Sequence, residues 1–198
     1  MTTDTLEHHD HHHDATGTSI FGFWIYIMSD CILFATLFAT FIVLHNNTFG
    51  GPSMKEIINI PYVFGETVFL LLSNFTFGMA ILSLYQSKKR MVMRWLTITF
   101  FLGLAFVVME VNEFIHLALE GHGWNHSGFL SGFFTLVGTH GLHVSIGLTW
   151  ILVSIFQLFK FGVTPFMRRR LTYLGMFWNF LDIVWIFVFT IVYLMGAI

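Results

Sequence analysis

The sequence predicts an all-α membrane protein built as a bundle of five transmembrane helices. Of its 198 residues, 56% are hydrophobic, only 10% carry a charge and 25 are phenylalanine. A soluble domain has about 25% charged residues, because they keep its surface hydrated. A chain this apolar cannot hide its side chains in a single core, so lipid is the expected surrounding. The net charge of −2 gives no argument for a nucleic-acid partner.

Five apolar stretches are long enough to cross a bilayer, since a span needs about 20 mostly apolar residues. They cover residues 20–46, 61–86, 92–119, 128–159 and 171–197. Pro61 suits the first turn of its helix, where a missing N–H costs nothing. Ser127 is placed to cap the helix over 128–159. The connections are short, so helices that follow each other in sequence are expected to pack antiparallel.

Basic residues predict the orientation, because short cytoplasmic loops are enriched in Lys and Arg. Eight of the nine Lys and Arg residues lie in or beside the two connections that follow the second and fourth predicted helices: Lys88, Lys89, Arg90, Arg94, Lys160, Arg168, Arg169 and Arg170. The ninth is Lys55. These connections share one side of the membrane, so the N-terminus is expected in the cytoplasm and the C-terminus in the periplasm. The run Arg168–Arg170 is also a candidate site for anionic lipid head groups.

Residues 1–19 form an acidic, histidine-rich segment before the five-helix domain of residues 20–198. Its apolar content is too low for packing, so we expect a disordered cytoplasmic tail. Two aspartates, Asp10 and Asp14, lie among five histidines: His8, His9, His11, His12 and His13. Imidazole-rich tracts bind Zn, Cu or Ni, so metal binding is the alternative to a solvated tail without a ligand.

Seven ionisable side chains lie well inside apolar stretches that contain no Lys or Arg: Asp30, Glu66, Glu110, Glu113, His140, His143 and Asp182. A charge at bilayer depth is expensive, so such residues face a protein interior and mark a functional or structural site. Five of the seven are acids without a basic partner inside the spans. Either several of them are protonated, or they pair with groups on another chain.

The spacing of these residues places several of them on common helix faces, since residues three or four apart are neighbours on a helix. This gives three pairs: Glu110 with Glu113, His140 with His143, and Asn179 with Asp182. At a rise of 1.5 Å per residue, four groups also reach one mid-bilayer level. They are Asp30 and Asp182 from one side, and His140 and His143 from the other.

Three interpretations are open for this set. In the first, the groups form a buried hydrogen-bonded network in which some carboxyl groups are neutral. In the second, they relay protons or gate a proton entry. In the third, His140 and His143 ligate a metal or haem, although His45 and His116 lie too near helix ends to complete the site. Without a Cys-x-x-Cys, phosphate loop or nucleophile elbow, we expect no catalytic residues and no metal in this chain.

Two motifs resemble signatures of subunit III of the haem–copper respiratory oxidases. One is residues 138–144 followed by Gly147, and the other is residues 177–185 in the last helix. Ser29-Asp30 is similar to the family's buried carboxylate element, and residues 112–114 to its Glu-plus-aromatic element. The resemblance covers residue 21 to the C-terminus. Asn179 departs from the His common at that position, and Asp30 is one methylene shorter than the Glu of many members.

The resemblance implies a non-catalytic subunit of a proton-pumping terminal oxidase in a bacterial inner membrane. Such a subunit carries no haem or copper, which sit in catalytic subunit I. It assembles with subunits I, II and IV, binds phospholipid and supports proton uptake. By the same resemblance, His140, His143 and Asp182 would form a polar face near the last helix, with Asp30 as the buried carboxylate.

The donor is expected to be ubiquinol. The five-helix length, the acidic tail and residues 193–196 resemble subunit III of the cytochrome bo-type ubiquinol oxidases. The complex would then pass electrons from ubiquinol to oxygen, which is reduced to water. Subunit III of a bacterial cytochrome c oxidase is the alternative within the family. From a different class, a small stand-alone proton channel or transporter is the rival.

Overall fold

The computed structural model describes residues 11–45, 59–119 and 127–194, with side chains from residue 17 onward. Within these residues, the elements are α1 (His11–Leu44), α3 (Ile60–Tyr85), α4 (Lys89–Leu119), α5 (Gly128–Phe161), α6 (Pro165–Val188) and the π-helix η1 (Phe189–Leu194). Five apolar spans are present, and η1 completes the last of them. The predicted all-α fold with five spans is confirmed. His8, His9 and Asp10 lie outside the described residues.

The helix ends agree with the capping expected from the sequence. The hydroxyl of Ser127 accepts a hydrogen bond from the backbone N–H of Leu130 at 3.2 Å, which caps α5. Pro61 lies in the first turn of α3, as predicted. The hydroxyl of Thr164 caps α6 in the same manner, by accepting from the N–H of Met167 at 3.2 Å. Each cap satisfies a backbone donor that the helix itself leaves unpaired.

Two helices begin earlier than predicted at the basic connections, and this corrects the placement of several basic residues. α4 begins at Lys89 and α6 at Pro165, so Lys89, Arg90 and the run Arg168–Arg170 lie in helical turns and not in loops. Pro165 and the Thr164 cap start α6 before its apolar run begins. Gly162 has a φ of 73°, a left-handed conformation that glycine adopts without strain and that turns the chain between α5 and α6.

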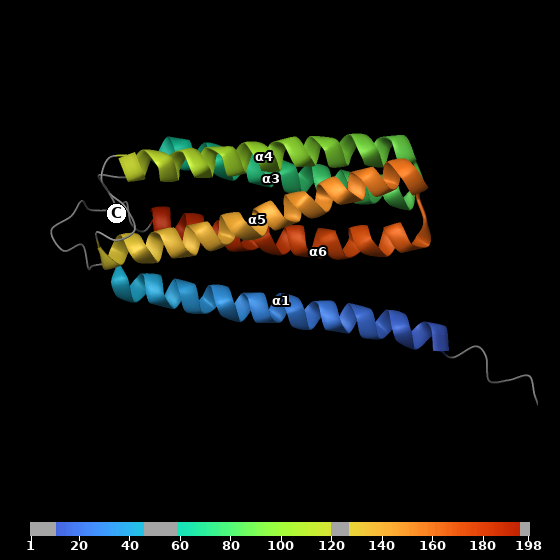
Figure 1. The fold of residues 1–198 in the computed structure, drawn as a ribbon, viewed down its shortest axis with the longest axis horizontal. Coiled ribbons are helices and arrows are strands. Elements are labelled where there is room, and N and C mark those ends of the chain that lie inside the picture. The colour runs from blue at the N-terminus through green and yellow to red at the C-terminus, as the bar shows by residue number, and fades with distance from the viewer. Residues whose placement is uncertain (1–10, 46–58, 120–126, 195–198) are drawn as a thin grey trace, which may run out of the picture.

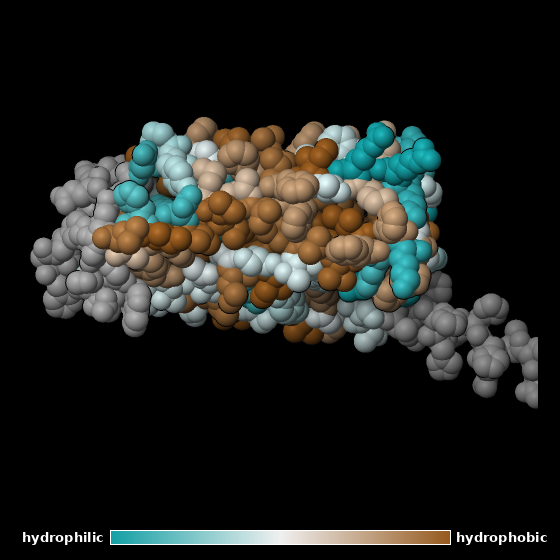
Figure 2. Space-filling view, turned by 45° about the horizontal axis from the view of Figure 1, so that its top comes forward, coloured by the Kyte–Doolittle hydropathy of each residue, from teal (hydrophilic) through white to brown (hydrophobic). Residues whose placement is uncertain are grey.

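α1 also begins earlier than the predicted residue 20, at His11, although its apolar span begins only at Gly17. In the bundle, α1 lies along α5 and α6, while α3 and α4 pair on the other side (Figure 1). α5 and α6 therefore occupy the centre of the bundle. Figure 2 shows a broad hydrophobic surface along the bundle, with hydrophilic side chains gathered towards its two ends.

Trp178 lies at the centre of this bundle and connects its own helix, α6, to three others. Its indole Nε1 donates to the hydroxyl of Ser73 on α3 at 3.0 Å. The ring also lies against Gly103 of α4 and Gly147 of α5, where an added Cβ would come within 3.1 Å and 2.8 Å of ring carbons. Small residues at such positions let membrane helices approach closely. The glycines thus make room for the indole that holds α6 in the centre.

Candidate functional site

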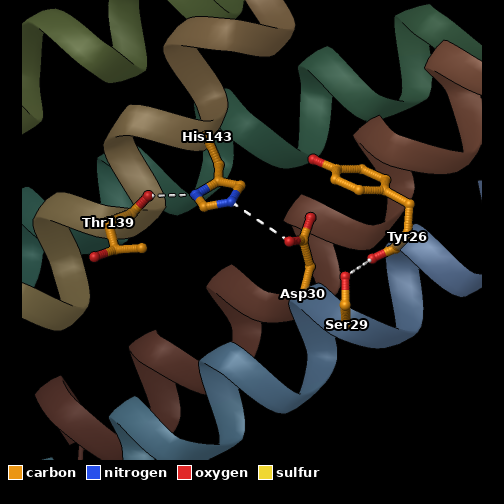
Figure 3. A network of polar contacts seen from close by, with 5 residues as sticks. All are labelled: Tyr26, Ser29, Asp30, Thr139 and His143. Atoms are coloured by element: carbon orange, nitrogen blue, oxygen red, sulfur yellow. Dashed lines mark hydrogen bonds and ion pairs between the residues drawn. The ribbon is translucent and has the colours of Figure 1, made fainter.

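His143 on α5 and Asp30 on α1 face each other across their helix interface (Figure 3). Nε2 of His143 lies 3.9 Å from Oδ1 of Asp30. Nδ1 of His143 lies 2.7 Å from the carbonyl oxygen of Thr139 and must carry a hydrogen, because a carbonyl can only accept. Nε2 therefore faces the carboxyl group as the second polar atom of the ring. The pair brings two ionisable side chains from different helices together inside the bundle.

Aromatic and hydroxyl groups of α1 surround this pair. The ring of Phe34 lies with its centroid 5.2 Å from that of His143. Tyr26 lies one turn before Asp30, with its ring beside the pair in Figure 3. The hydroxyl of Ser29 donates to the carbonyl of Tyr26 at 2.7 Å and is thereby taken up by its own helix. Among these neighbours, sequence reasoning named Asp30 and His143 but not Tyr26 or Phe34.

His140 lies on the same helix as His143 but in different surroundings. It is fully buried, with its ring centroid 5.1 Å from that of Trp185 and 6.0 Å from that of Phe106. Neither ring nitrogen has a hydrogen-bond partner among the described residues. The two histidines are thus neighbours on the helix that face different groups. In the part of the chain that the structure describes, no group of three or more His, Cys, Asp or Glu residues could hold a metal ion.

A second polar group, which we call the acid cluster, consists of Glu66, Glu110, Glu113, Tyr62 and Tyr193. The hydroxyl of Tyr193 in η1 donates to Oε2 of Glu113 on α4 at 3.0 Å. Tyr62 on α3 donates to the carbonyl of Met109 on α4 at 3.0 Å. The three carboxyl groups are close enough to interact electrostatically. The cluster therefore connects α3, α4 and η1 through groups that the sequence alone placed on separate helices.

Glu66 and Glu110 are the buried acids of the acid cluster. They are 0% and 2% exposed, and none of their carboxyl oxygens has a hydrogen-bond partner within the described residues. The carboxyl group of Glu110 lies against Gly141 of α5, where a Cβ would come within 2.5 Å of Oε1. Gly141 thus provides the space that the carboxyl group occupies. Glu113 is only half-buried, which differs from the fully interior position predicted for it.

Asp182 is buried on α6 and bonds a residue that sequence reasoning missed. Its Oδ2 accepts from the Asn74 amide of α3 at 3.0 Å. The expected polar face that joins Asp182 to His140 and His143 is therefore replaced by a contact between α6 and α3. Asn179 was expected to be buried beside Asp182, but it is exposed. The side chains of Trp178 and Asp182 both turn towards α3, which leaves the face with Asn179 pointing outward.

Comparison with known proteins decides which family has this architecture. The family described as "Cytochrome c oxidase subunit III" matches residues 2–197. The chain belongs to this family. A cytochrome bo(3) ubiquinol oxidase subunit 3 of Pseudomonas aeruginosa is 55% identical over 96% of this chain and 91% of its own length. The corresponding subunit of Pseudomonas putida is 53% identical over 94% of this chain and 90% of its own.

A cytochrome c oxidase subunit 3 of Bacillus sp. (strain PS3) is 41% identical over 89% of this chain and 86% of its own length. As a subunit III, the chain is part of a multi-subunit terminal oxidase complex of the respiratory chain. Its five apolar spans and its bacterial relatives make it a multi-pass protein of the bacterial inner membrane.

Several residues that hold this subunit III together were not predicted as site residues. Trp185 donates to the hydroxyl of Thr67 at 3.0 Å, in parallel with the bond between Trp178 and Ser73. The sequence feature that could have identified them is a seven-residue spacing, since the two tryptophans are seven residues apart on one helix face. On α3, Thr67 and Asn74 have the same spacing. Polar residues that recur at this spacing in an apolar helix indicate a face that bonds another helix.

The arginine run of this subunit III forms contacts with its own chain. Nη2 of Arg168 donates to the hydroxyl of Ser87 at 2.7 Å, and Nη1 of Arg170 donates to Oε1 of Gln157 at 2.6 Å. Arg168 thus joins the start of α6 to the connection between α3 and α4. The same residues remain our candidates for binding a lipid head group, alongside this structural use.

Proposed function

We propose that this subunit III belongs to a proton-pumping ubiquinol oxidase and stabilises its catalytic subunit without a redox group of its own. Two relatives at 53% and 55% identity are named as ubiquinol oxidase subunits, whereas the cytochrome c oxidase relative is 41% identical. This difference favours ubiquinol as the donor. In the proposed complex, haems and copper lie in subunit I, and subunits II and IV complete the assembly.

The observation that carries the stabilising role is that the polar side chains of the spans connect helices. Trp178 and Trp185 bond hydroxyl groups of α3, and Asp182 bonds Asn74 of the same helix. Asp30 and His143 face each other between α1 and α5. Hydrogen bonds between membrane helices fix their packing. Such a bundle is suited to present a rigid surface to a larger neighbour.

We also propose that the N-terminus is cytoplasmic and the C-terminus periplasmic. The connections from α3 to α4 and from α5 to α6 lie at one end of the bundle, next to the start of α1 (Figure 1). Eight of the nine Lys and Arg residues belong to these connections or to the helix turns beside them. The excess of positive charge at this end favours its location in the cytoplasm. Phospholipid would bind there through the arginine run.

We propose a supporting role in proton uptake for the pair of Asp30 and His143. Nε2 of His143 lies 3.9 Å from Oδ1 of Asp30, and both side chains are ionisable. Two such groups that face each other inside the spans are suited to pass a proton between α1 and α5. The acid cluster adds further carboxyl groups towards the C-terminal end of α4.

The test compares the purified oxidase with and without this subunit. We expect the initial rate of ubiquinol oxidation to change little, while the number of turnovers before inactivation falls. Loss of the initial rate with all haems still in place would contradict a stabilising role. Reduced cytochrome c is the control donor and should not support oxygen uptake. Proton flux through liposomes that contain this chain alone would instead favour a channel.

A further inference from the structure

Asn179 is a polar side chain at the middle of the last span, which runs over 30 residues from Pro165 to Leu194. It is exposed on the surface of the chain. The hydrocarbon layer is about 30 Å thick, so a residue halfway along a span lies about 15 Å from either head-group region. Lipid chains offer no hydrogen bonds at this depth, and head groups do not reach it.

The amide of Asn179 makes no hydrogen bond within the described part of the chain. Six exposed threonine hydroxyls donate to carbonyl groups of their own helices, namely those of Thr36, Thr40, Thr135, Thr149, Thr172 and Thr190. A hydroxyl on a membrane helix is therefore satisfied locally. An amide has two donor hydrogens and an acceptor oxygen, and the Asn179 amide needs a partner from elsewhere.

The surroundings of Asn179 form a face of α6 that none of the other described helices covers. Ile183 and Ile186 flank it at helical spacing and are 54% and 46% exposed. On one side of this face, α1 packs against Phe177 and Phe180 of α6. On the other side, α3 bonds Trp178, Asp182 and Trp185. We call this exposed strip, with Asn179 at its centre, the outer face of α6.

We propose that the outer face of α6 receives a transmembrane helix from another subunit of the oxidase, with a polar group at mid-depth that bonds the Asn179 amide. We take the occupant to be a helix because a transmembrane helix crosses the full depth of the bilayer and so can hold a polar side chain level with Asn179. Its remaining contacts are apolar, to match Ile183 and Ile186. This inference rests on the proposed function in one respect, namely that the chain works inside a complex.

A photo-cross-linking experiment locates the occupant. The exposed Cys31 is first replaced, as Cys31→Ser, and Asn179→Cys then carries a small benzophenone maleimide in the assembled oxidase. We expect adducts with another oxidase subunit. Adducts with phospholipid alone, or with a second copy of this chain, would overturn the inference.

Leu142→Cys is the matched probe on α5, where Leu142 is 61% exposed on a different face. If Leu142→Cys links to another subunit and Asn179→Cys does not, the docking surface lies on α5 and the inference fails. The proposed function would survive that result, because the chain would still be docked in a complex.

A second measurement tests the hydrogen bond itself. The subunit that carries Asn179→Leu should dissociate from the complex about threefold to thirtyfold faster in detergent, which is the range for one hydrogen bond between membrane helices. Asn179→Gln should recover part of this loss. The control is Thr190→Val on the same span, because its hydroxyl bonds the carbonyl of Ile186. If the subunit with Asn179→Leu stayed in the complex as long as the wild-type subunit, the proposal would be contradicted, whatever the rate of ubiquinol oxidation.

Discussion

Trp178 and Ser73 join the central helix α6 to α3 through a buried hydrogen bond of 3.0 Å. Seven residues further along α6, Trp185 repeats the arrangement with Thr67. Two tryptophans on one face thus meet two hydroxyl groups on the facing helix. The indole of Trp178 in turn fills the space left by Gly103 and Gly147. Four helices are therefore positioned around one line of side chains.

The first prediction concerns the space that Gly147 leaves for Trp178. Gly147→Ala places a Cβ within 2.8 Å of a carbon of the indole ring, which is held by its bond to Ser73. We expect a loss of about 1–3 kcal/mol, the usual cost of overpacking a core. Gly78→Ala is the control, because no atom lies within 4 Å of its added Cβ. Thermal denaturation of the purified complex should show that the first variant is less stable than wild type. The second variant should be as stable as wild type or more so.

The second prediction concerns the hydrogen bond between Trp178 and Ser73. Ser73→Ala leaves the buried indole N–H without a partner, which costs about 1–3 kcal/mol. Trp178→Phe removes the donor and adds a cavity. The double variant should be more stable than the sum of the single effects implies, since it no longer contains an unpaired group. Strict additivity in denaturation experiments would contradict the bond.

The third prediction concerns the carboxyl group of Glu110 against Gly141. Gly141→Ala puts a Cβ within 2.5–2.8 Å of three carboxyl atoms. We expect this variant to lower the thermal stability of the complex by about 1–3 kcal/mol. Glu110→Ala should restore part of the loss in the double variant, because it removes the atoms that clash. If Glu110→Ala made Gly141→Ala worse, the contact between the two would be wrong.

The fourth prediction concerns Asp30. Asp30→Asn keeps the size of the side chain and can still bond Nε2 of His143, but it can no longer give up a proton. We expect the initial rate of ubiquinol oxidation to stay close to wild type while the number of turnovers before inactivation falls. A matched change is Asp182→Asn, in which the amide can still accept from Asn74. Complete loss of the initial rate in an intact complex would show that Asp30 is needed for the chemistry itself.

The sequence predicted the fold well, because each span is a long apolar stretch bounded by turns or charges. Helix ends at the basic connections were harder to place, since Pro165 and Thr164 begin α6 before the apolar run. Length and hydropathy report which residues enter the membrane. They do not report where a polar turn of helix outside the membrane begins.

The polar residues were identified correctly in kind, but only some of their partners could be predicted. Spacing along one helix places His140 beside His143, yet it says nothing about the rotation of neighbouring helices. That rotation turns Asp182 towards Asn74, leaves Asn179 outside and brings Tyr193 to Glu113. It depends on how the tryptophans and glycines fit together, which is a property of the whole bundle.

The central claim is that this subunit III is a helical scaffold without a redox group of its own. Its histidines favour this, since His140 is enclosed by aromatic rings and both nitrogens of His143 face groups of this chain. The most direct test is the visible absorption spectrum of the separately purified chain beside that of the intact oxidase. We expect the haem Soret band only in the intact oxidase, where the larger chains hold the haems. A stoichiometric Soret band in the isolated chain would contradict the claim.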